Sequence, residues 1–336
     1  MAHDDSENEI VVSVCCIAFN HADYIRDAMD GFLAQNCNFF FEILVHDDAS
    51  TDGTLEILLD YERRFPNVVK VFAEEENQYG KNKYKGGYFS FLEGFARGKY
   101  IAFCEGDDYW CDPGKLQSQV DYFEAHPECA ETCHSAKVVD GVSGHCLGIM
   151  GMGDIPCDIR MADLLRKWSI PTASRMFRRD ISKGYLDFKE QIPKAPVGDF
   201  PRAIYSATKG YIHYEPQCMS IYRFRTPGSW TAGIVGWKRQ VENSSNWLEM
   251  LGSIDEVTSG CCHSQIVDAC VPHVRKIEAY QGISLRQTGL AGEAVRRFTV
   301  IDWAKLILSR MLFKLGFAFQ MEGYGESASR HIVRCR

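Results

Sequence analysis

The sequence of 336 residues lacks any run of 18 consecutive apolar residues, the length that a bilayer-spanning helix requires. Its N-terminal residues are polar and acidic, which is the reverse of a secretory leader. Cysteine is also too sparse, at 14 residues, for a disulfide-stapled scaffold, so we expect reduced thiols. These absences predict a soluble, cytoplasmic protein.

Basic residues are also fewer than acidic ones. The chain has 37 Lys and Arg against 45 Asp and Glu, a net charge of −8. Nucleic-acid binders need a basic surface for phosphate contacts, so we expect no nucleic-acid partner. With 46% hydrophobic and 24% charged residues, the composition is globular and excludes intrinsic disorder. The length allows one large α/β domain or a core domain with an appended half.

A cluster of cysteine and histidine residues invites comparison with zinc sites. Its members are Cys129, Cys133, His134, His145 and Cys146. Structural zinc sites use closely paired ligands at regular spacing, and the spacing here is irregular. The pattern favours buried thiols over a zinc site.

The first hundred residues alternate between strand and helix patterns. Residues 10–19 form a continuous apolar, β-branched run, typical of a strand buried on both faces. Further strands are predicted at 41–46, 68–73 and 99–104. We expect Ser50 or Thr51 to cap the helix after the second strand. The alternation predicts an α/β fold with a mostly parallel central sheet flanked by helices.

Acidic residues follow two of these strands. Asp47 and Asp48 end the second strand, and Glu105, Asp107 and Asp108 follow the fourth. A single acid could be a helix cap, but two acidic clusters at one sheet edge repel each other unless a cation or donors compensate. Carboxylates suit Mg²⁺ or Mn²⁺ held together with substrate phosphates, which predicts a nucleoside diphosphate site. The Gly-rich phosphate motifs of dehydrogenases and P-loop ATPases do not follow the first strand.

Taken together, these segments resemble the inverting family 2 glycosyltransferases of the GT-A fold, the type found in bacterial polysaccharide biosynthesis. The resemblance lies in residues 13–20, 42–54 and 99–116, which keep the family's order and spacing. It implies a GT-A-like domain at 1–230 and a helical C-terminal region at 231–336. Within the domain, it implies a nucleotide-sugar half at 1–125 and an acceptor half at 126–230.

The resemblance implies roles in base recognition for the residues that match the family's motifs. Phe19 and Asn20 would line the base pocket. Asp47, with Asp48 beside it, would read the base, usually uracil. A carboxylate that accepts a hydrogen bond from the imide N–H of uracil favours binding of a base with a donor at that position.

The resemblance also implies contacts to the diphosphate and its metal ion, Mn²⁺ or Mg²⁺. Asp107 stands where the last acid of the family's D-x-D element holds the metal. Glu105 replaces the first Asp, which leaves its contact to the ribose open. Asp108 would support the metal site or cap the loop. Lys81 and Lys83 lie where the family often places diphosphate contacts, although a solvated charged loop explains them equally well.

In the second half, Asp199 stands where relatives carry an acid just before a helix. It would be the base that takes the proton from the acceptor hydroxyl, and it could also cap the helix at 200–208. Arg225 occupies the place of a family histidine that completes the metal or diphosphate site. An arginine cannot bind a metal, but it can hold phosphate. Trp230 would stack on an acceptor sugar or pack internally.

The C-terminal segment 296–320 is apolar with interspersed basic residues. These basic residues are Arg296, Arg297, Lys305, Arg310 and Lys314. A basic amphipathic helix of this kind can lie on a membrane surface. Packing on the catalytic domain, or on a second copy in a homo-oligomer, is the alternative.

The resemblance implies an enzyme that moves a sugar from a nucleotide-sugar donor, a UDP-sugar, to a hydroxyl of a glycan or lipid-linked acceptor. The transfer would proceed with inversion, at the inner face of the plasma membrane, during synthesis of a surface polysaccharide such as capsule or lipopolysaccharide. The alternative is a catalytically silent scaffold that binds nucleotide or glycan. A nucleotidyltransferase is disfavoured because such enzymes open with a Gly-rich loop after the first strand.

Overall fold

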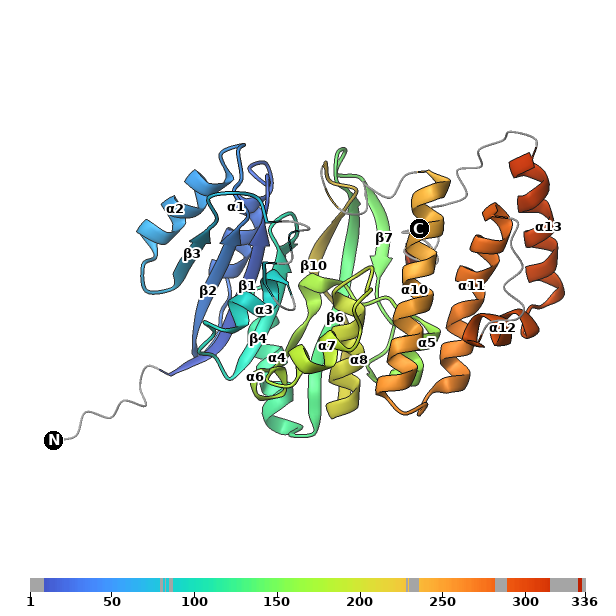
Figure 1. Cartoon of the computed structure of the whole chain (residues 1–336). Helices are drawn as coiled ribbons and strands as arrows, with labels where there is room; N and C mark the ends of the chain where they lie inside the picture. The colour runs from blue at the N-terminus through green and yellow to red at the C-terminus, as the bar shows by residue number, and fades with distance from the viewer. Residues whose placement is uncertain are drawn as a thin grey trace.

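The computed structural model describes residues 9–78, 81, 83–84, 87–227, 229, 236–281, 289–314 and 332–333. Strands and helices alternate through its N-terminal part, drawn in blue and cyan in Figure 1. The elements there are β1 (Ile10–Ala18), α1 (Ile25–Leu33), β2 (Phe40–Asp47), α2 (Thr54–Arg64), β3 (Val69–Ala73), α3 (Tyr88–Glu93), β4 (Tyr100–Glu105), β5 (Tyr109–Trp110) and α4 (Lys115–Ala125).

The central part adds longer strands and short helices. Its elements are β6 (Cys129–Asp140), β7 (Cys146–Met150), β8 (Cys157–Ile159), α5 (Met161–Arg166), a 3-10 turn (Thr172–Ser174), β9 (Met176–Arg178), α6 (Arg179–Ser182), α7 (Tyr185–Glu190), α8 (Asp199–Lys209) and β10 (Tyr211–Phe224). The C-terminal part is mainly helical. It consists of α10 (Trp237–Val257), α11 (His263–Gln281), α12 (Gly289–Arg296), α13 (Val300–Lys314) and β11 (Ile332–Val333).

One mixed sheet runs through the molecule in the order β11-β7-β6-β9-β4-β1-β2-β3. Strands β1 to β4 pair in parallel, and β10 runs parallel to β6. By contrast, β9 lies antiparallel between β4 and β6, and β7 lies antiparallel on β6. The α/β class with a central sheet is therefore confirmed. Parallel pairing dominates the first half, and the sheet becomes mixed in the second.

The parallel register brings the two acidic strand ends to one edge of the sheet. Ala18 of β1 pairs with Asp47 of β2 on one side, and Ile17 pairs with Glu105 of β4 on the other. Since neighbouring strands lie about 4.8 Å apart, Asp47 and Glu105 flank β1 at about 10 Å from each other. The acidic clusters thus border one small region.

The helix after β2 is not capped as the sequence pattern suggests. Its N-cap is Gly53, in a left-handed conformation with φ 97°, and neither Ser50 nor Thr51 caps it. The Asp52 carboxylate accepts the Thr54 N–H instead, at 3.0 Å. The Ser50 hydroxyl is used elsewhere, because it accepts the backbone N–H of Asn20 at 2.9 Å. The tertiary contact therefore outweighs the local capping preference.

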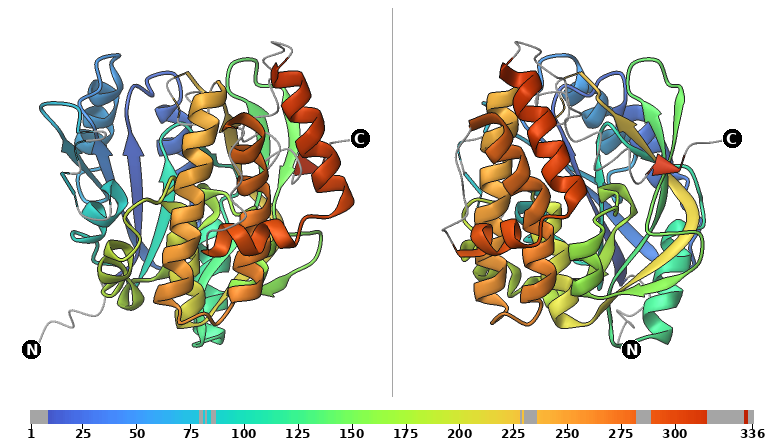
Figure 2. Two further views of the ribbon diagram at one scale, coloured as in Figure 1. Left: turned by 45° about the vertical axis from the view of Figure 1, so that its right-hand side comes forward. Right: turned by 90° about the vertical axis from the view of Figure 1, so that its right-hand side faces the viewer.

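The C-terminal helices pack against the second half of the sheet. Figure 2 shows α10, α11 and α13 side by side. The buried face of α10 contributes Trp247, Met250 and Ile254 to a core that includes residues of α8 and α11. A separate core fills the space between the first half of the sheet and helices α1, α2 and α4. The C-terminal region is thus joined to the rest by a continuous apolar core.

The predicted amphipathic segment 296–320 is interrupted rather than continuous. Helix α12 ends at Arg296, and α13 begins at Val300. The break occurs where the Thr299 hydroxyl accepts the Asp302 N–H at 3.2 Å and the Asp302 carboxylate accepts the Thr299 N–H at 3.0 Å. This reciprocal pair starts a new helix. Residues 315–320 lie outside the described residues, and no described helix is long and apolar enough to cross a membrane.

Gly98 lies where the chain passes very close to β1, and we predict that Gly98→Ala destabilises the fold. A Cβ at this position would stand 2.5 Å from the Ser13 nitrogen and 2.7 Å from the Val12 carbonyl carbon. Overpacking against a rigid strand costs about 1–3 kcal/mol, which should lower the urea midpoint. Gly153→Ala is the control because its Cβ meets nothing within 4 Å. Equal midpoints for the two variants would contradict the prediction.

Candidate active site

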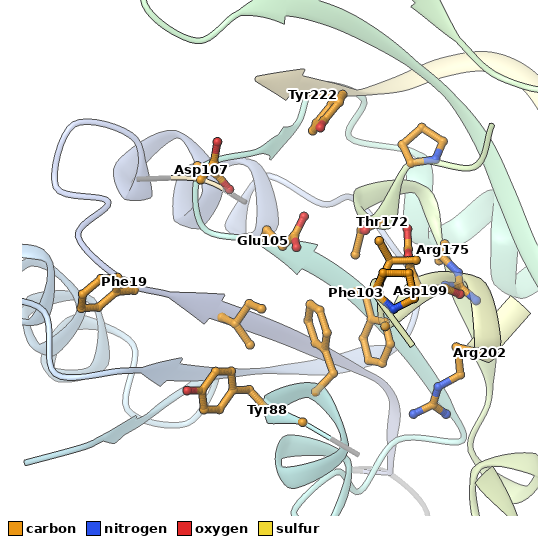
Figure 3. A pocket seen from close by; sticks show the side chains of 18 of the residues that line it. Phe19, Tyr88, Phe103, Glu105, Asp107, Thr172, Arg175, Asp199, Arg202 and Tyr222 are labelled. Atoms are coloured by element: carbon orange, nitrogen blue, oxygen red, sulfur yellow. The ribbon is translucent and has the colours of Figure 1, made fainter. Parts of the chain in front are cut away.

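A cavity of about 1040 Å³ lies at the carboxyl ends of β1, β2 and β4. Both halves of the sheet and α10 contribute to its lining. Figure 3 shows Glu105 and Asp107 at the end of β4, and Asp199 and Arg175 close to Thr172 on other elements. Ligand pockets usually measure about 300–1,000 Å³, so this cavity has room for more than one small substrate.

At the end of β1, Phe19 lines the cavity with 41% of its surface exposed. Asn20 is not among the residues that line the cavity. It adopts a left-handed conformation with φ 53°, and its side-chain oxygen accepts the Thr51 N–H at 2.9 Å. Asn20 thereby ties β1 to the loop after β2 and positions that loop.

Of the two acids after β2, the structure places Asp48 on the cavity. Asp48 accepts hydrogen bonds from the Gln78 N–H at 2.7 Å and from the Tyr88 hydroxyl at 2.8 Å. Asp47 is fully buried and accepts the Ser50 N–H at 3.0 Å. Its other carboxylate oxygen is buried with no hydrogen-bond partner among the described residues. Asp48 is therefore the one of these two acids that lines the cavity, with 3% of its surface exposed.

The acidic strand end after β4 holds three carboxyl groups close together. Burial raises the pKa of Glu105 to about 8, and the negative charges of Asp107 and Asp199 add to the rise. Burial, followed by the charge of Asp107, also raises the pKa of Asp108. One oxygen of Asp108 is buried with no hydrogen-bond partner in the described part of the chain. The raised pKa values mean that the surrounding residues do not compensate for full ionisation of the cluster.

Arg223 is the basic residue that meets this cluster. Its guanidinium donates to the Asp107 carbonyl at 2.8 Å, and its backbone N–H donates to the Asp108 carboxylate at 2.8 Å. It also lines the cavity. Arg225, which the motif comparison singled out, is exposed and has a left-handed backbone with φ 61°. The kink at Arg225 accompanies a bond from the Thr226 hydroxyl to the Asp107 carboxylate at 2.7 Å.

The donor set fits a divalent cation that is shared with a substrate. Glu105 and Asp107 both line the cavity, and the unpaired oxygen of Asp108 lies behind them. Mg²⁺ is typically held by one or two carboxylates, substrate phosphates and water. Within the described residues, no group of three or more His, Cys, Asp or Glu is placed to hold a metal ion. The remaining ligands would therefore come from the substrate and water.

Two other candidates from the sequence, Lys81 and Lys83, do not line the cavity. Lys81 forms an ion pair with Glu76 at 2.8 Å, and Lys83 forms one with Glu74 at 2.5 Å. Both lysines are thus engaged by carboxylates of their own loop, and neither lines the cavity. Trp230 lies outside the described residues.

Asp199 reaches the cavity from the first turn of α8. Gly198 is the N-cap residue of this helix, and the Asp199 carboxylate accepts the Phe200 N–H at 2.9 Å. Burial raises the pKa of Asp199, while the positive charge of Arg175 opposes the rise. A carboxylate whose pKa is raised is better suited to accept a proton from a hydroxyl group.

Arg175 is fully buried and holds Asp199 in place. Its guanidinium donates to both oxygens of the Glu131 carboxylate, at 2.5 and 2.9 Å. A third bond, of 2.8 Å, goes to the Asp199 carbonyl. The pair joins β6 to the first residue of α8.

Several lining residues escaped the sequence reasoning. Arg175 lies within residues 126–230, the predicted acceptor half, and Arg223 lies two residues before Arg225. Nothing in the local sequence pattern distinguishes these two arginines, which line the cavity, from arginines exposed on the surface. Polar residues of α10 also line the cavity. They reach it only because α10 packs against the rest of the domain, which the local sequence does not reveal.

The comparison with known families agrees with this geometry. Residues 13–146 match the model of the family described as Glycosyl transferase family 2. Residues 13–146 therefore carry the sequence pattern of the family 2 glycosyltransferases.

Relatives in bacteria share this part of the chain. The uncharacterized protein Rv1520 of Mycobacterium tuberculosis is 34% identical over 223 residues, which cover 65% of this chain and 60% of that protein. The chain thus matches about three-fifths of the length of this relative. The UDP-Glc:alpha-D-GlcNAc-diphosphoundecaprenol beta-1,3-glucosyltransferase WfaP of Escherichia coli is 31% identical over 114 residues, 34% of this chain and 41% of WfaP.

Among solved structures, S. aureus TarS 1-349 in complex with UDP-GlcNAc has a similar fold. It superposes with a TM-score of 0.54 and 15% identity, covering 93% of this chain and 94% of TarS 1-349. The fold is accordingly the GT-A fold with additional C-terminal helices.

We predict that Arg175→Met strongly destabilises the protein. The change would leave the carboxylate of Glu131 buried without its partner, and breaking a buried pair in this way costs about 3–5 kcal/mol. Arg166→Met is the matched control, since Arg166 forms an exposed pair with Asp163 at 3.4 Å and should contribute less than about 1 kcal/mol. Urea unfolding followed by tryptophan fluorescence measures both. Equal stability of the two variants would show that the buried pair does not support the fold.

Proposed function

We propose that this chain is a metal-assisted glycosyltransferase that moves a sugar from a UDP-sugar to a hydroxyl of a glycan or lipid-linked acceptor. The observation that carries the proposal is the meeting of Glu105, Asp107 and Asp199 in one cavity. The names of WfaP, which uses UDP-Glc and a diphosphoundecaprenol-linked sugar, and of the TarS complex with UDP-GlcNAc support a uridine nucleotide. The setting would be surface polysaccharide synthesis at the cytoplasmic face of the membrane.

The reaction is a single in-line displacement with inversion. The Asp199 carboxylate takes the proton of the acceptor hydroxyl while that oxygen bonds to the anomeric carbon. The bond from the anomeric carbon to the diphosphate oxygen breaks on the opposite face, and UDP leaves with the electron pair. Arg223 stabilises the charge that develops on the diphosphate. Mn²⁺ or Mg²⁺ held by Asp107 would add Lewis-acid stabilisation of the same charge.

The nucleotide base would lie at the end of β1. The exposed ring of Phe19 offers a surface for stacking, and the carboxylate of Asp48 can accept the uracil imide N–H. Asp47 and Asn20 support this contact from behind by shaping the loop after β2. The alternative function, a silent scaffold, would keep nucleotide binding and lack donor turnover.

We expect UDP to bind more tightly with Mn²⁺ than with a chelator, and more tightly than GDP. Asp107→Asn should weaken UDP binding in Mn²⁺ by about tenfold, the equivalent of about 1.4 kcal/mol, because a charged ligand is lost. Titration calorimetry measures these affinities. A preference for GDP would overturn the assigned donor, and loss of any metal effect would overturn the metal site.

We expect Asp199→Asn to bind UDP normally and to lose turnover. The assay follows UDP release from UDP-glucose and UDP-GlcNAc, with water in the place of the acceptor hydroxyl. Removal of a general base costs about 10²–10⁴-fold in rate. Wild-type turnover by the variant would exclude Asp199 as the base, and absence of turnover in the wild type would favour the scaffold.

We also propose that α13 contacts the membrane surface. Four large apolar side chains on this helix are exposed, with Val300 the most exposed at 85%. The others are Ile301, Ile307 and Leu308, which share one face of the helix at helical spacing. Lys305 is exposed beside them and would favour anionic headgroups.

The double change Ile301→Asn and Ile307→Asn should reduce binding to vesicles of phosphatidylglycerol and phosphatidylcholine by about tenfold, because apolar burial in the interface is lost. Co-sedimentation measures the binding. Val142→Asn is the control, since Val142 is 78% exposed but lies far from α13 in the sequence. Unchanged vesicle binding, or a dimer in light scattering that the double change dissolves, would show that this face binds another copy instead.

A further inference from the structure

One wall of the cavity is formed by residues from the last third of the sequence. Glu242, Asn243 and Asn246 of α10 line it, together with Arg239 one turn earlier. Positions spaced by three and four residues share one face of a helix. Helix α10 therefore presents a continuous polar stripe, defined here as Glu242, Asn243 and Asn246, to the same cavity that holds Asp199.

This stripe belongs to a rigid element. One turn further along the same side of the helix, α10 buries Met250, Leu251 and Ile254 in the core. Trp247, one residue after Asn246, is 8% exposed, and its ring lies 5.3 Å from the ring of Phe200. Phe200 directly follows Asp199, so the stripe and the proposed base are positioned by one packing contact. Sites on well-packed helices hold their geometry better than sites on loops.

The stripe lies on the side of Asp199 away from the donor end. Phe19 and Asp48 directly follow strands β1 and β2, and Glu105 ends β4, whereas α10 packs beyond β6 and β10 (Figure 1). Trp168 also lines the cavity, with its ring 5.2 Å from that of Phe200. An aromatic surface and a polar stripe thus flank Asp199 where a second substrate must approach.

The side chains of the stripe match one ligand chemistry. Asn243 and Asn246 are half-buried, and neither makes a side-chain hydrogen bond to the described residues. An amide both donates and accepts, as does a sugar hydroxyl, and the Glu242 carboxylate accepts from hydroxyls while repelling anions. The two amides favour a hydroxyl-rich ligand, and the Glu242 carboxylate disfavours a phosphorylated or acidic group beside it, while Arg239 places one positive charge a turn away.

We propose that the stripe of α10, with Trp168, forms the acceptor subsite and binds a neutral saccharide. The proposal rests on the proposed function, because it assigns the second substrate of that reaction. The saccharide lies along α10 with one hydroxyl directed at the Asp199 carboxylate. Its specificity is then set by a helix beyond the strands that bind the donor.

Saturation-transfer NMR on the full chain with UDP and Mg²⁺ tests this assignment. The probes are the methyl glycosides of glucose, N-acetylglucosamine, galactose and mannose. We expect at least one to bind the wild type. Asn243→Ala and Asn246→Ala should each weaken it by about fivefold through loss of a hydrogen bond, with the Kd for UDP unchanged within about twofold.

A matched pair of glutamates on the same helix provides the control. Glu242→Ala should weaken glycoside binding, whereas Glu256→Ala should not, because Glu256 is exposed on α10 but does not line the cavity. Methyl glucuronide should bind more weakly than methyl glucoside to the wild type, and Glu242→Ala should narrow that difference.

The outcomes separate this proposal from the proposed function. If UDP binds but no glycoside does, or if glycoside binding ignores every change in the stripe, the acceptor subsite lies elsewhere. If UDP fails to bind while glycosides still depend on Asn246, the subsite stands and the transferase assignment falls.

Discussion

The buried ion pair between Arg175 and Glu131 is the interaction on which the site depends. Glu131 lies on β6, and Arg175 immediately precedes β9 and donates to the carbonyl of Asp199 on α8. The Arg175 carbonyl in turn accepts the N–H of Phe103 on β4, at 3.1 Å. A single residue thus links β4, which ends at Glu105, to α8, which begins at Asp199. Because both charges are removed from water, neither can be lost without leaving the other uncompensated.

The charged side chains are distributed unevenly along the cavity. One end concentrates the carboxyls of Glu105, Asp107 and Asp108, whose mutual repulsion and burial raise the pKa values of Glu105 and Asp108. A cation and the phosphates that it binds would relieve this strain, with Arg223 already at the edge. The other end, beyond Asp199, is lined by the polar side of α10 and by an aromatic ring. The two ends of the cavity therefore differ in chemistry, with three carboxyl groups at the β4 end and amide and aromatic side chains beyond Asp199.

The sequence anticipated the parts of the fold that depend on local patterns. Strands β1 to β4 fall where their apolar runs predict, since a strand buried on both faces needs continuous hydrophobicity. The acids at their ends were found for the same reason. Two of the assignments that failed to reach the cavity involved a choice between neighbours: Asp48 lines it and Asp47 does not, and Arg223 lines it where Arg225 is exposed. The local backbone conformation, such as the left-handed residue at Arg225, determines which of two neighbouring side chains points into the cavity. The amino-acid sequence around such a position gives little indication of that conformation.

What the sequence determined by itself was the class of fold, the similarity to family 2 glycosyltransferases and the acidic strand ends, because each follows from residues close together in the chain. Only the tertiary structure decided that Arg175 is buried against Glu131 and that α10 forms a wall of the cavity. Those contacts join residues separated by 44 positions in the first case and by an intervening strand and loop in the second. Their formation depends on which surfaces are buried when the sheet and the C-terminal helices pack, and no local periodicity specifies that choice.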